Sequence, residues 1–180
     1  MKIIRIITSY DAMHLFLNEE KIMENKIAII LAILLLLITI FSTVFYFGRL
    51  KVSFIEWLFF NPCAISNIVF LIGLATSLFT GNKTLIYIAI LPMLFFGTLG
   101  MFFLPWNGMN IIPQIGHIIM TLNIAWSIYG IYKLQNYQSA TTSLFAGIII
   151  FSIFIAIQQS YVREHPEDFK RILIDATAKK

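Results

Sequence analysis

The amino-acid sequence predicts an all-α protein, a polytopic transmembrane helical bundle with about five membrane-spanning helices. Of its 180 residues, 59% are hydrophobic, and the mean hydropathy is +0.85. Only 12% of the residues are charged, whereas soluble domains average about a quarter. Between Glu56 and Arg163 the only charged residues are Lys83 and Lys133. A charge at mid-bilayer costs roughly 3 kcal/mol or more, so this long stretch is expected to lie in lipid.

Residues 1–26 precede the first apolar run and allow two interpretations. Residues 1–7 are apolar and basic and residues 11–25 are polar, which fits a helix at the membrane interface. The alternative is that translation begins at Met23, directly before the apolar run. A cleaved signal peptide is not expected, because the apolar run after Lys26 is too long and no small-residue cleavage site closes it.

The first predicted span covers residues 27–47. A helix of this length reaches about 31 Å, which is the thickness of the hydrocarbon core. No polar side chain occurs in the span before Thr39. We therefore expect this helix to be an anchor or a lipid-facing wall that carries no part of a site.

The second and third spans are predicted at residues 57–80 and 84–104. Pro62 removes one helical hydrogen bond, so it should bend the start of the second span and free nearby carbonyls for the Asn61 amide. Pro92 predicts a kink in the third span.

Small residues on these two spans predict close helix contacts. Gly73 and Ser77 are spaced four residues apart on the second span, and Gly97 and Gly100 offer a packing face on the third. Such residues let helix backbones approach each other closely in membranes.

The fourth span, at about residues 110–132, is the most polar of the set. A fifth, shorter span follows at residues 143–160. Residues 161–180 form a charged tail, in which residues 167–176 are predicted to form a short amphipathic helix. The domain organisation is thus an amino-terminal segment, the bundle of residues 27–160, and the tail.

The distribution of positive charge predicts the orientation. Five crossings put the termini on opposite faces; lysine and arginine number six on the amino-terminal face (residues 2, 5, 21, 26, 83 and 133) and seven on the other (residues 49, 51, 163, 170, 171, 179 and 180). If the chain starts at Met23, the count becomes three against seven, and the carboxyl terminus is predicted to be cytoplasmic. The formal net charge of +4 therefore indicates orientation in a cell membrane and contact with membrane lipid. No basic patch is interleaved with stacking aromatics, so nucleic acid is not an expected partner.

Two clusters of polar side chains, at residues 61–67 and 107–117, open the second and fourth spans at matching depth. Both spans enter from the same face, with Cys63 roughly 9 Å and His117 roughly 10 Å from their starts. Gln114 and Thr121 share the helical face of His117. Polar stripes at one depth in lipid should face each other, because neither can face acyl chains cheaply.

A cysteine beside a histidine is a usable nucleophile and base. A thiolate attacks an acyl group, the imidazole takes the thiol proton, and a thioester intermediate divides acyl transfer into two steps. Cys63 and His117 are therefore the candidate catalytic residues. The amides of Asn61, Asn67 and Gln114 can donate to a developing oxyanion, and with Thr121 they are the candidate substrate-binding residues.

A purely structural interpretation accounts for the same residues. A lone cysteine in an apolar helix is commonly a small core residue, and Asn67, Gln114 and Thr121 suit interhelical hydrogen bonds. One cysteine leaves no internal disulfide. One cysteine and one histidine without carboxylates fall short of a metal-ligand set, and no cofactor is expected.

Several short motifs between residues 57 and 133 form a recognisable pattern: Asn61-Pro62-Cys63, Gly97, Phe103-Leu104-Pro105-Trp106-Asn107, Pro113 and His117. This pattern resembles that of the bacterial YwaF-type integral membrane protein family. That group is similar to a eukaryotic transmembrane acyltransferase that moves polyunsaturated acyl chains onto ether phospholipids. Both are distantly similar to androgen-induced membrane hydrolases of fatty acid esters, which pair a threonine with a histidine.

The resemblance implies that Cys63 is the nucleophile and His117 the base of a lipid acyl enzyme, either a transferase or an ester hydrolase. The chain departs from the pattern at Ala64, where histidine is expected, and in having fewer spans. Two other classes of function stay open. One is a small transporter or substrate-capture subunit for an uncharged solute, and the other is a non-catalytic membrane scaffold or partner subunit. The sequence predicts no particular oligomeric state.

Overall fold

The computed structural model describes residues 26–103, 106 and 111–177, which form helices joined by short connections, with no strand among them. Five of the described helices are long and apolar enough to cross a membrane. The predicted all-α bundle is confirmed, and the protein is an integral membrane protein. The predicted segment 1–26 lies outside the described residues except for Lys26.

The helices follow one another with few intervening residues. The long ones are an amino-terminal helix (Lys26–Arg49, closed by the π-helical turn η1, Phe45–Arg49), α3 (Pro62–Thr80), a composite third helix (Thr84–Phe102), α6 (Ile111–Leu134) and α7 (Tyr137–Glu164). The composite third helix runs through α4 (Thr84–Met93) and the π-helical turn η2 (Leu94–Thr98) and includes all but the last residue of α5 (Gly100–Phe103). The short ones are α2 (Phe54–Phe60) and α8 (Pro166–Thr177).

The carboxyl-terminal helices differ in length from their predicted spans. Helix α7 has 28 residues and extends beyond residues 143–160 at both ends. Its polar ends continue the helix past the apolar middle, and its length of about 42 Å exceeds the hydrocarbon thickness. Helix α8 covers the predicted amphipathic segment 167–176.

The second span begins later than predicted, because the chain breaks at Asn61. A separate helix, α2, precedes the break and starts with a capping box between Ser53 and Glu56. Pro62 then occupies the first turn of α3, where its missing N–H costs no hydrogen bond.

The break leaves two backbone carbonyls that other helices satisfy. The Gln158 amide of α7 donates to the Phe59 oxygen at 2.7 Å, and the Tyr46 hydroxyl of the amino-terminal helix donates to the Phe60 oxygen at 3.0 Å. The Asn61 side chain was expected to satisfy carbonyls of this kind. It accepts from the Ala64 N–H instead and so caps α3.

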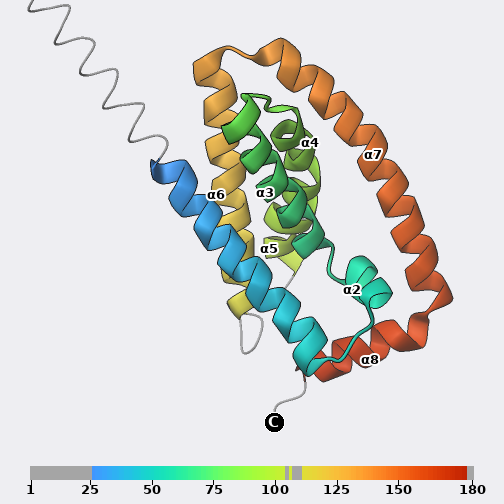
Figure 1. The fold of residues 1–180 in the computed structure, drawn as a ribbon. Helices are drawn as coiled ribbons and strands as arrows, with labels where there is room; N and C mark the ends of the chain where they lie inside the picture. The colour runs from blue at the N-terminus through green and yellow to red at the C-terminus, as the bar shows by residue number, and fades with distance from the viewer. Residues whose placement is uncertain (1–25, 104–105, 107–110, 178–180) are drawn as a thin grey trace, which may run out of the picture.

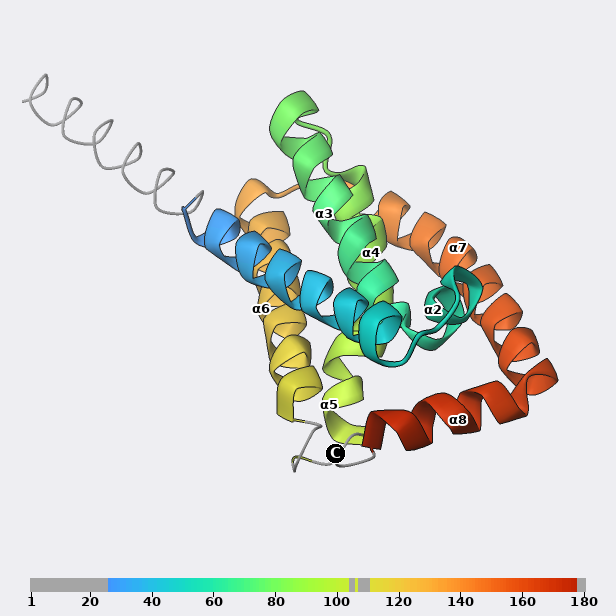
Figure 2. The same ribbon diagram turned by 60° about the horizontal axis from the view of Figure 1, so that its bottom comes forward.

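Helix α4 lies at the centre of the bundle and packs against α3, α6 and α7. The amino-terminal helix runs obliquely across α3 and α6, and α7 lies on the opposite side (Figure 1). Helices α2 and α8 are joined by an ion pair between Glu56 and Arg171, near the end where the amino-terminal helix finishes (Figure 1). Figure 2 shows α8 turning back from the end of α7. At this end Ile172 joins a buried cluster with Leu50, Val52, Trp57 and Ala64.

The amino-terminal helix contributes more than the lipid-facing wall that its composition suggested. Leu35 is fully buried, and the Thr39 hydroxyl donates to the Leu35 oxygen and accepts from the Asn67 amide at 3.0 Å. One turn further on, Ser42 accepts from the Asn61 amide at 2.9 Å. The helix therefore holds the start of α3 in place, since polar groups within a membrane must find partners on neighbouring helices.

Two of the predicted close contacts at small residues are present. A Cβ atom at Gly73 would lie 2.7 Å from the Ile86 nitrogen, so α3 and α4 approach there backbone to backbone. A Cβ atom at Gly97 would lie 2.8 Å from the Met120 Cβ, which marks a close approach of η2 to α6. Glycine at these positions sets how near the helices lie.

Candidate active site

Cys63 lies in the first turn of α3, directly after the break at Asn61. Its Sγ atom is 3.7 Å from the Nε2 atom of His117, which α6 carries. The two residues are 54 positions apart in the chain, and both lie near the helix ends on one side of the bundle. The structure therefore brings the lone thiol and the imidazole into direct contact, within the range of a sulfur hydrogen bond.

A backbone carbonyl also faces the thiol. Cys63 Sγ lies 3.5 Å from the Phe96 oxygen, to which the S–H can donate. Phe96 belongs to the π-helical turn η2, which begins two residues after Pro92. π-Helical turns of this kind are often found at functional sites. The thiol proton thus has two acceptors within reach, the Phe96 oxygen and the imidazole nitrogen.

Gln114 determines which imidazole nitrogen carries the proton. Its Nε2 atom donates to the Met101 oxygen at 3.2 Å, and because a carbonyl only accepts, this bond orients the amide. The Gln114 Oε1 atom then lies 3.1 Å from His117 Nδ1 and accepts its hydrogen. In the neutral ring Nε2 is therefore the unprotonated nitrogen, and it faces Cys63.

Gly100 at the start of α5 supports the flat face of the His117 ring. A Cβ atom there would lie 2.9 Å from Cε1 and 3.1 Å from Nε2 of the imidazole. His117 is 5% exposed and the Gln114 side chain is fully buried. The imidazole is therefore held by packing on one face and by a hydrogen bond at Nδ1.

The other predicted substrate-binding residues bond elsewhere. Thr121 donates to the His117 backbone oxygen and its hydroxyl lies 3.0 Å from that of Thr98, so it links α6 to η2. Asn61 bonds to Ser42, and Asn67 bonds to Thr39. No described hydrogen bond joins any of these three to the side chain of Cys63 or His117. Of the predicted set, Cys63, His117 and Gln114 form one connected group.

Sequence reasoning missed the parts of this group that backbone atoms supply. The Phe96 and Met101 carbonyls carry no residue-type signal, since every residue has one. Gly100 was predicted, with Gly97, to form a helix-packing face. The sequence does not show that the group packed against it is the His117 ring. Thr39 and Ser42, which bond to residues near the thiol, carry only a weak signal because their helix is otherwise apolar.

The ligand set for a metal ion is incomplete. Among the residues that the structure describes, no group of three or more His, Cys, Asp or Glu side chains gathers around a point. Cys63 and His117 supply two ligands, fewer than a zinc site in a protein requires. The chemical groups that the described site presents are a thiol and an imidazole.

A search for similar proteins found no matching family model, no matching curated protein and no matching solved structure. The arrangement of Cys63, His117 and Gln114 in an integral membrane protein is therefore the basis for assigning a function.

Proposed function

We propose that the protein is a membrane-embedded acyl enzyme, a transferase or an ester hydrolase, that acts on a lipid ester through Cys63 and His117. The observation that carries the proposal is the 3.7 Å contact between the thiol and a ring nitrogen left unprotonated by the Gln114 bond. Thiol acyl chemistry needs a nucleophile, a base beside it and a group that orients the base. Cys63, His117 and Gln114 are linked in that order. The resemblance of the sequence pattern to that of YwaF-type proteins, an expectation from the sequence, is in keeping with the same chemistry.

The reaction follows from the positions of the protons. His117 Nε2 takes the Cys63 proton as the sulfur bonds to the ester carbonyl carbon. The tetrahedral adduct collapses, the bond to the alcohol oxygen breaks, and the imidazolium returns its proton to the leaving alcohol. A water or an acceptor hydroxyl then attacks the thioester, His117 takes its proton, and the thiol is restored by the same transfer in reverse.

The depth of the pair suits an ester at the membrane interface. Cys63 lies in the first turn of α3, and His117 lies about 9 Å along α6 from its first residue. Glycerolipid esters lie at the boundary between headgroups and hydrocarbon, which this depth matches. A developing oxyanion needs preorganised hydrogen-bond donors. In the first turn of α3, Pro62 has no N–H and the Ala64 N–H already donates to the Asn61 side chain. The amide nitrogens predicted for that role already donate to Ser42, Thr39 and the Met101 carbonyl.

Acyl capture on Cys63 tests the proposal. The purified protein in detergent is incubated with a phospholipid whose acyl chain carries an alkyne, and the protein-bound label is measured before and after neutral hydroxylamine, which cleaves thioesters. Wild type should carry a hydroxylamine-sensitive label. Cys63→Ser should lose it, and His117→Ala should acquire it about 100-fold more slowly or worse.

Ser127→Ala is the matched control, since it removes a hydroxyl that bonds within α6 and lies outside the site. It should label like wild type, and all four proteins should elute as single species in size-exclusion chromatography. Equal labelling of wild type, Cys63→Ser and His117→Ala would overturn the proposal.

The alternative function, a non-catalytic membrane scaffold, is supported by the residues around Cys63 and His117. The Thr98–Thr121 and Thr39–Asn67 contacts are interhelical hydrogen bonds, as a scaffold would use. If the Cys63→Ala, His117→Ala double variant fully replaces wild type in cells, a scaffold is favoured. Uptake of an uncharged solute that depends on the protein would favour a transporter.

We also propose that the carboxyl-terminal end faces the cytoplasm. Among the described residues, Arg49, Lys51, Arg163, Lys170 and Arg171 lie at that end, against Lys26, Lys83 and Lys133 at the other. This asymmetry follows the tendency of cytoplasmic loops to carry more lysine and arginine. The acyl site would then open near the cytoplasmic interface.

A further inference from the structure

The carboxyl-terminal helix α8 crosses the end of the bundle that carries Cys63. Figure 1 shows it running from the end of α7, beneath α2, toward the end of the amino-terminal helix. Only His165 separates α7 from α8, which begins at Pro166. The His165 ring stacks on Tyr161 with 4.2 Å between the centroids, and Tyr161 stacks on Phe59 of α2 at 4.5 Å. The joint is thus anchored on α2, and α8 extends from it like a strap.

A buried side chain and an ion pair attach α8 to the bundle. Ile172 is 5% exposed and belongs to the buried cluster that contains Trp57. The Arg171 guanidinium pairs with Glu56 of α2 and lies 3.8 Å from Asp168 of α8 itself. Because the Arg171 side chain is 44% exposed, water and salt screen the pair. An attachment of this kind can open without disturbing the rest of the bundle.

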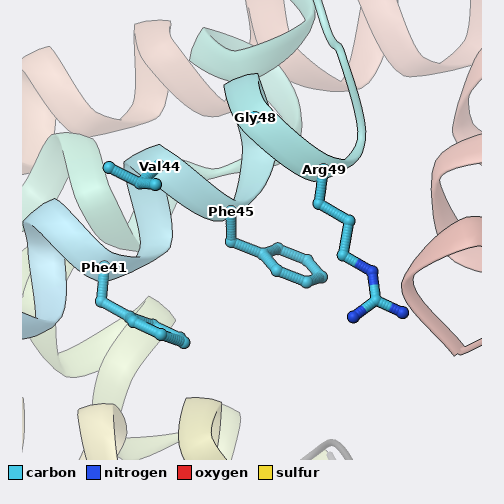
Figure 3. A pocket seen from close by; sticks show the side chains of 5 residues that line it. All are labelled: Phe41, Val44, Phe45, Gly48 and Arg49. Carbon is cyan, nitrogen blue, oxygen red and sulfur yellow. The ribbon is translucent and has the colours of Figure 1, made fainter.

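The attached position of α8 leaves one buried polar group unsatisfied. Trp57 is 6% exposed, and its Nε1–H has no acceptor in the part of the chain that the structure describes. The ring lies among apolar groups, with the Phe47 and Phe54 rings at 5.6 and 5.7 Å. Phe45, which Figure 3 shows on the last turns of the amino-terminal helix, packs against the same cluster. A buried N–H without an acceptor is costly, whereas an indole at the membrane interface can donate to water or lipid oxygens. Trp57 therefore favours detachment of α8.

The sequence of α8 suits a second position on the lipid surface. Apolar residues recur at spacings of three and four along its 12 residues, with charged residues between them. A helix with one apolar and one charged face lies in the plane of the membrane interface. Ile172 would then contact lipid in place of the cluster, so its apolar surface stays out of water in both positions.

We propose that α8 is a reversible strap, which slows entry of the lipid ester to Cys63 when it is attached and admits the ester when it moves onto the lipid surface. Ala64, the residue after Cys63, is 1% exposed and shares the buried cluster with Ile172, so α8 packs at the turn of α3 that carries the nucleophile. Detachment leaves α2 in place, because Tyr46 and Gln158 still bond to its last two carbonyls. The effect on Cys63 rests on the acyl function proposed above, whereas the two positions of α8 do not.

Two measurements on an Arg171→Gln variant test the strap. The first is acrylamide quenching of Trp57 fluorescence, in a protein whose Trp106 and Trp126 are replaced by phenylalanine. The second is the rate of hydroxylamine-sensitive acyl labelling, in the protein with all three tryptophans. Loss of the ion pair should raise the quenching constant and the labelling rate by about two-fold or more, because α8 is detached in a larger fraction of the molecules. Arg171→Lys keeps the charge and should stay close to wild type.

The direction of the change in labelling separates a strap from a helix that only stabilises the fold. Loss of a purely structural contact would slow labelling or leave it unchanged, whereas opening a strap speeds it. Ile172→Ala, which weakens the attachment through the buried cluster, should act in the same direction as Arg171→Gln. Thermal unfolding in detergent verifies that both variants fold.

Lys170→Gln is the control, since it removes a positive charge from an exposed position of α8 outside the ion pair. It should match wild type in both measurements. The strap is refuted if Arg171→Gln and Ile172→Ala leave the quenching of Trp57 unchanged, or if they raise it while labelling is unchanged or slower. If wild type acquires no acyl label, the acyl function fails instead, and the quenching measurement still decides whether α8 detaches.

Discussion

At the scale of single residues, the Gln114 amide decides what His117 can do. It receives the Nδ1 hydrogen through Oε1 and is itself anchored to the Met101 oxygen through Nε2. The imidazole therefore presents a lone pair to Cys63 without any charged partner, which suits a site within lipid. The residues that orient a catalytic histidine matter because a rotated ring presents the wrong nitrogen.

Replacing Gln114 by methionine, which has a similar volume and no hydrogen-bonding amide, tests this role. Hydroxylamine-sensitive acyl labelling of Cys63 should slow by roughly 10- to 100-fold, because the ring loses its anchor while the thiol is unchanged. A Gln114→Glu variant should not restore the rate, since a buried carboxylate is costly in lipid. A Gln114→Met protein that labels as fast as wild type would remove Gln114 from the mechanism.

Gly100 gives a second prediction at this scale. In Gly100→Ala the new methyl group would lie 2.9 Å from His117 Cε1, so the ring must move or the helices must separate. We expect a loss of about 1–3 kcal/mol in stability, as for overpacked cores, together with slower labelling. Gly130→Ala on α6 is the control: nothing lies within 4 Å of its added Cβ, so it should be neutral or stabilising by about 0.5–1 kcal/mol. Thermal unfolding in detergent measures both.

At the scale of elements, α2 is held by three different helices. The amino-terminal helix bonds to its last carbonyl through Tyr46, and α7 bonds to the one before through Gln158. Helix α8 contributes an ion pair between Arg171 and Glu56. Because α2 leads directly into the break before Cys63, these contacts fix where the nucleophile begins.

The ion pair predicts a pH dependence. Desolvation raises the pKa of Glu56, but the Ser53 backbone and hydroxyl hydrogen bonds and the Arg171 guanidinium outweigh it and lower the pKa below its ordinary value of 4.5. A carboxylate with a lowered folded pKa stabilises the fold fully above its unfolded pKa, and this stabilisation is lost as the pH falls through the folded pKa.

The melting temperature of wild type should therefore fall as the pH drops from about 6 to about 3.5. Glu56→Gln should be less stable than wild type at the upper end and should show a flatter profile, so the two curves converge at low pH. Parallel curves for the two proteins would show that Glu56 contributes no pH-dependent stability. The difference between the two melting temperatures at each pH removes the effect of the other carboxylates, because both proteins contain them.

At the scale of the whole molecule, the ends of the five long helices form two sides of the bundle that differ in charge. The Thr80–Thr84 turn belongs to the end with fewer cations, and α8 belongs to the other. If the carboxyl-terminal end is cytoplasmic, these two segments must differ in their access to reagents outside the cell.

Single-cysteine labelling tests this orientation in a Cys63→Ala background, which has no other cysteine. An Asn82→Cys variant should react with a membrane-impermeant maleimide in intact cells, whereas Glu167→Cys should react only after permeabilisation. Both substitutions leave every lysine and arginine in place, so the charge asymmetry is undisturbed. The reverse pattern would invert the proposed orientation.

The sequence by itself determined the fold class and the number of long helices, and it placed Cys63 and His117 near the openings of two spans that enter from one face. These follow from quantities that depend on no neighbour: the cost of a charge in lipid, the hydrocarbon thickness, and the constant rise of a helix. The same reasoning failed at the start of the second span, because a proline can either bend a helix or begin one.

Only the tertiary structure decided which groups surround the thiol. Rotation of each helix about its axis and the π-helical turn at Leu94–Thr98 bring the Phe96 oxygen to Cys63 and leave Gly100 under the imidazole. The apolar amino-terminal helix became a partner of Asn61 and Asn67 through the hydroxyls of Ser42 and Thr39. Composition cannot specify the rotation of each helix, because lipid solvates every apolar face alike. The few buried polar contacts between helices select the rotation instead.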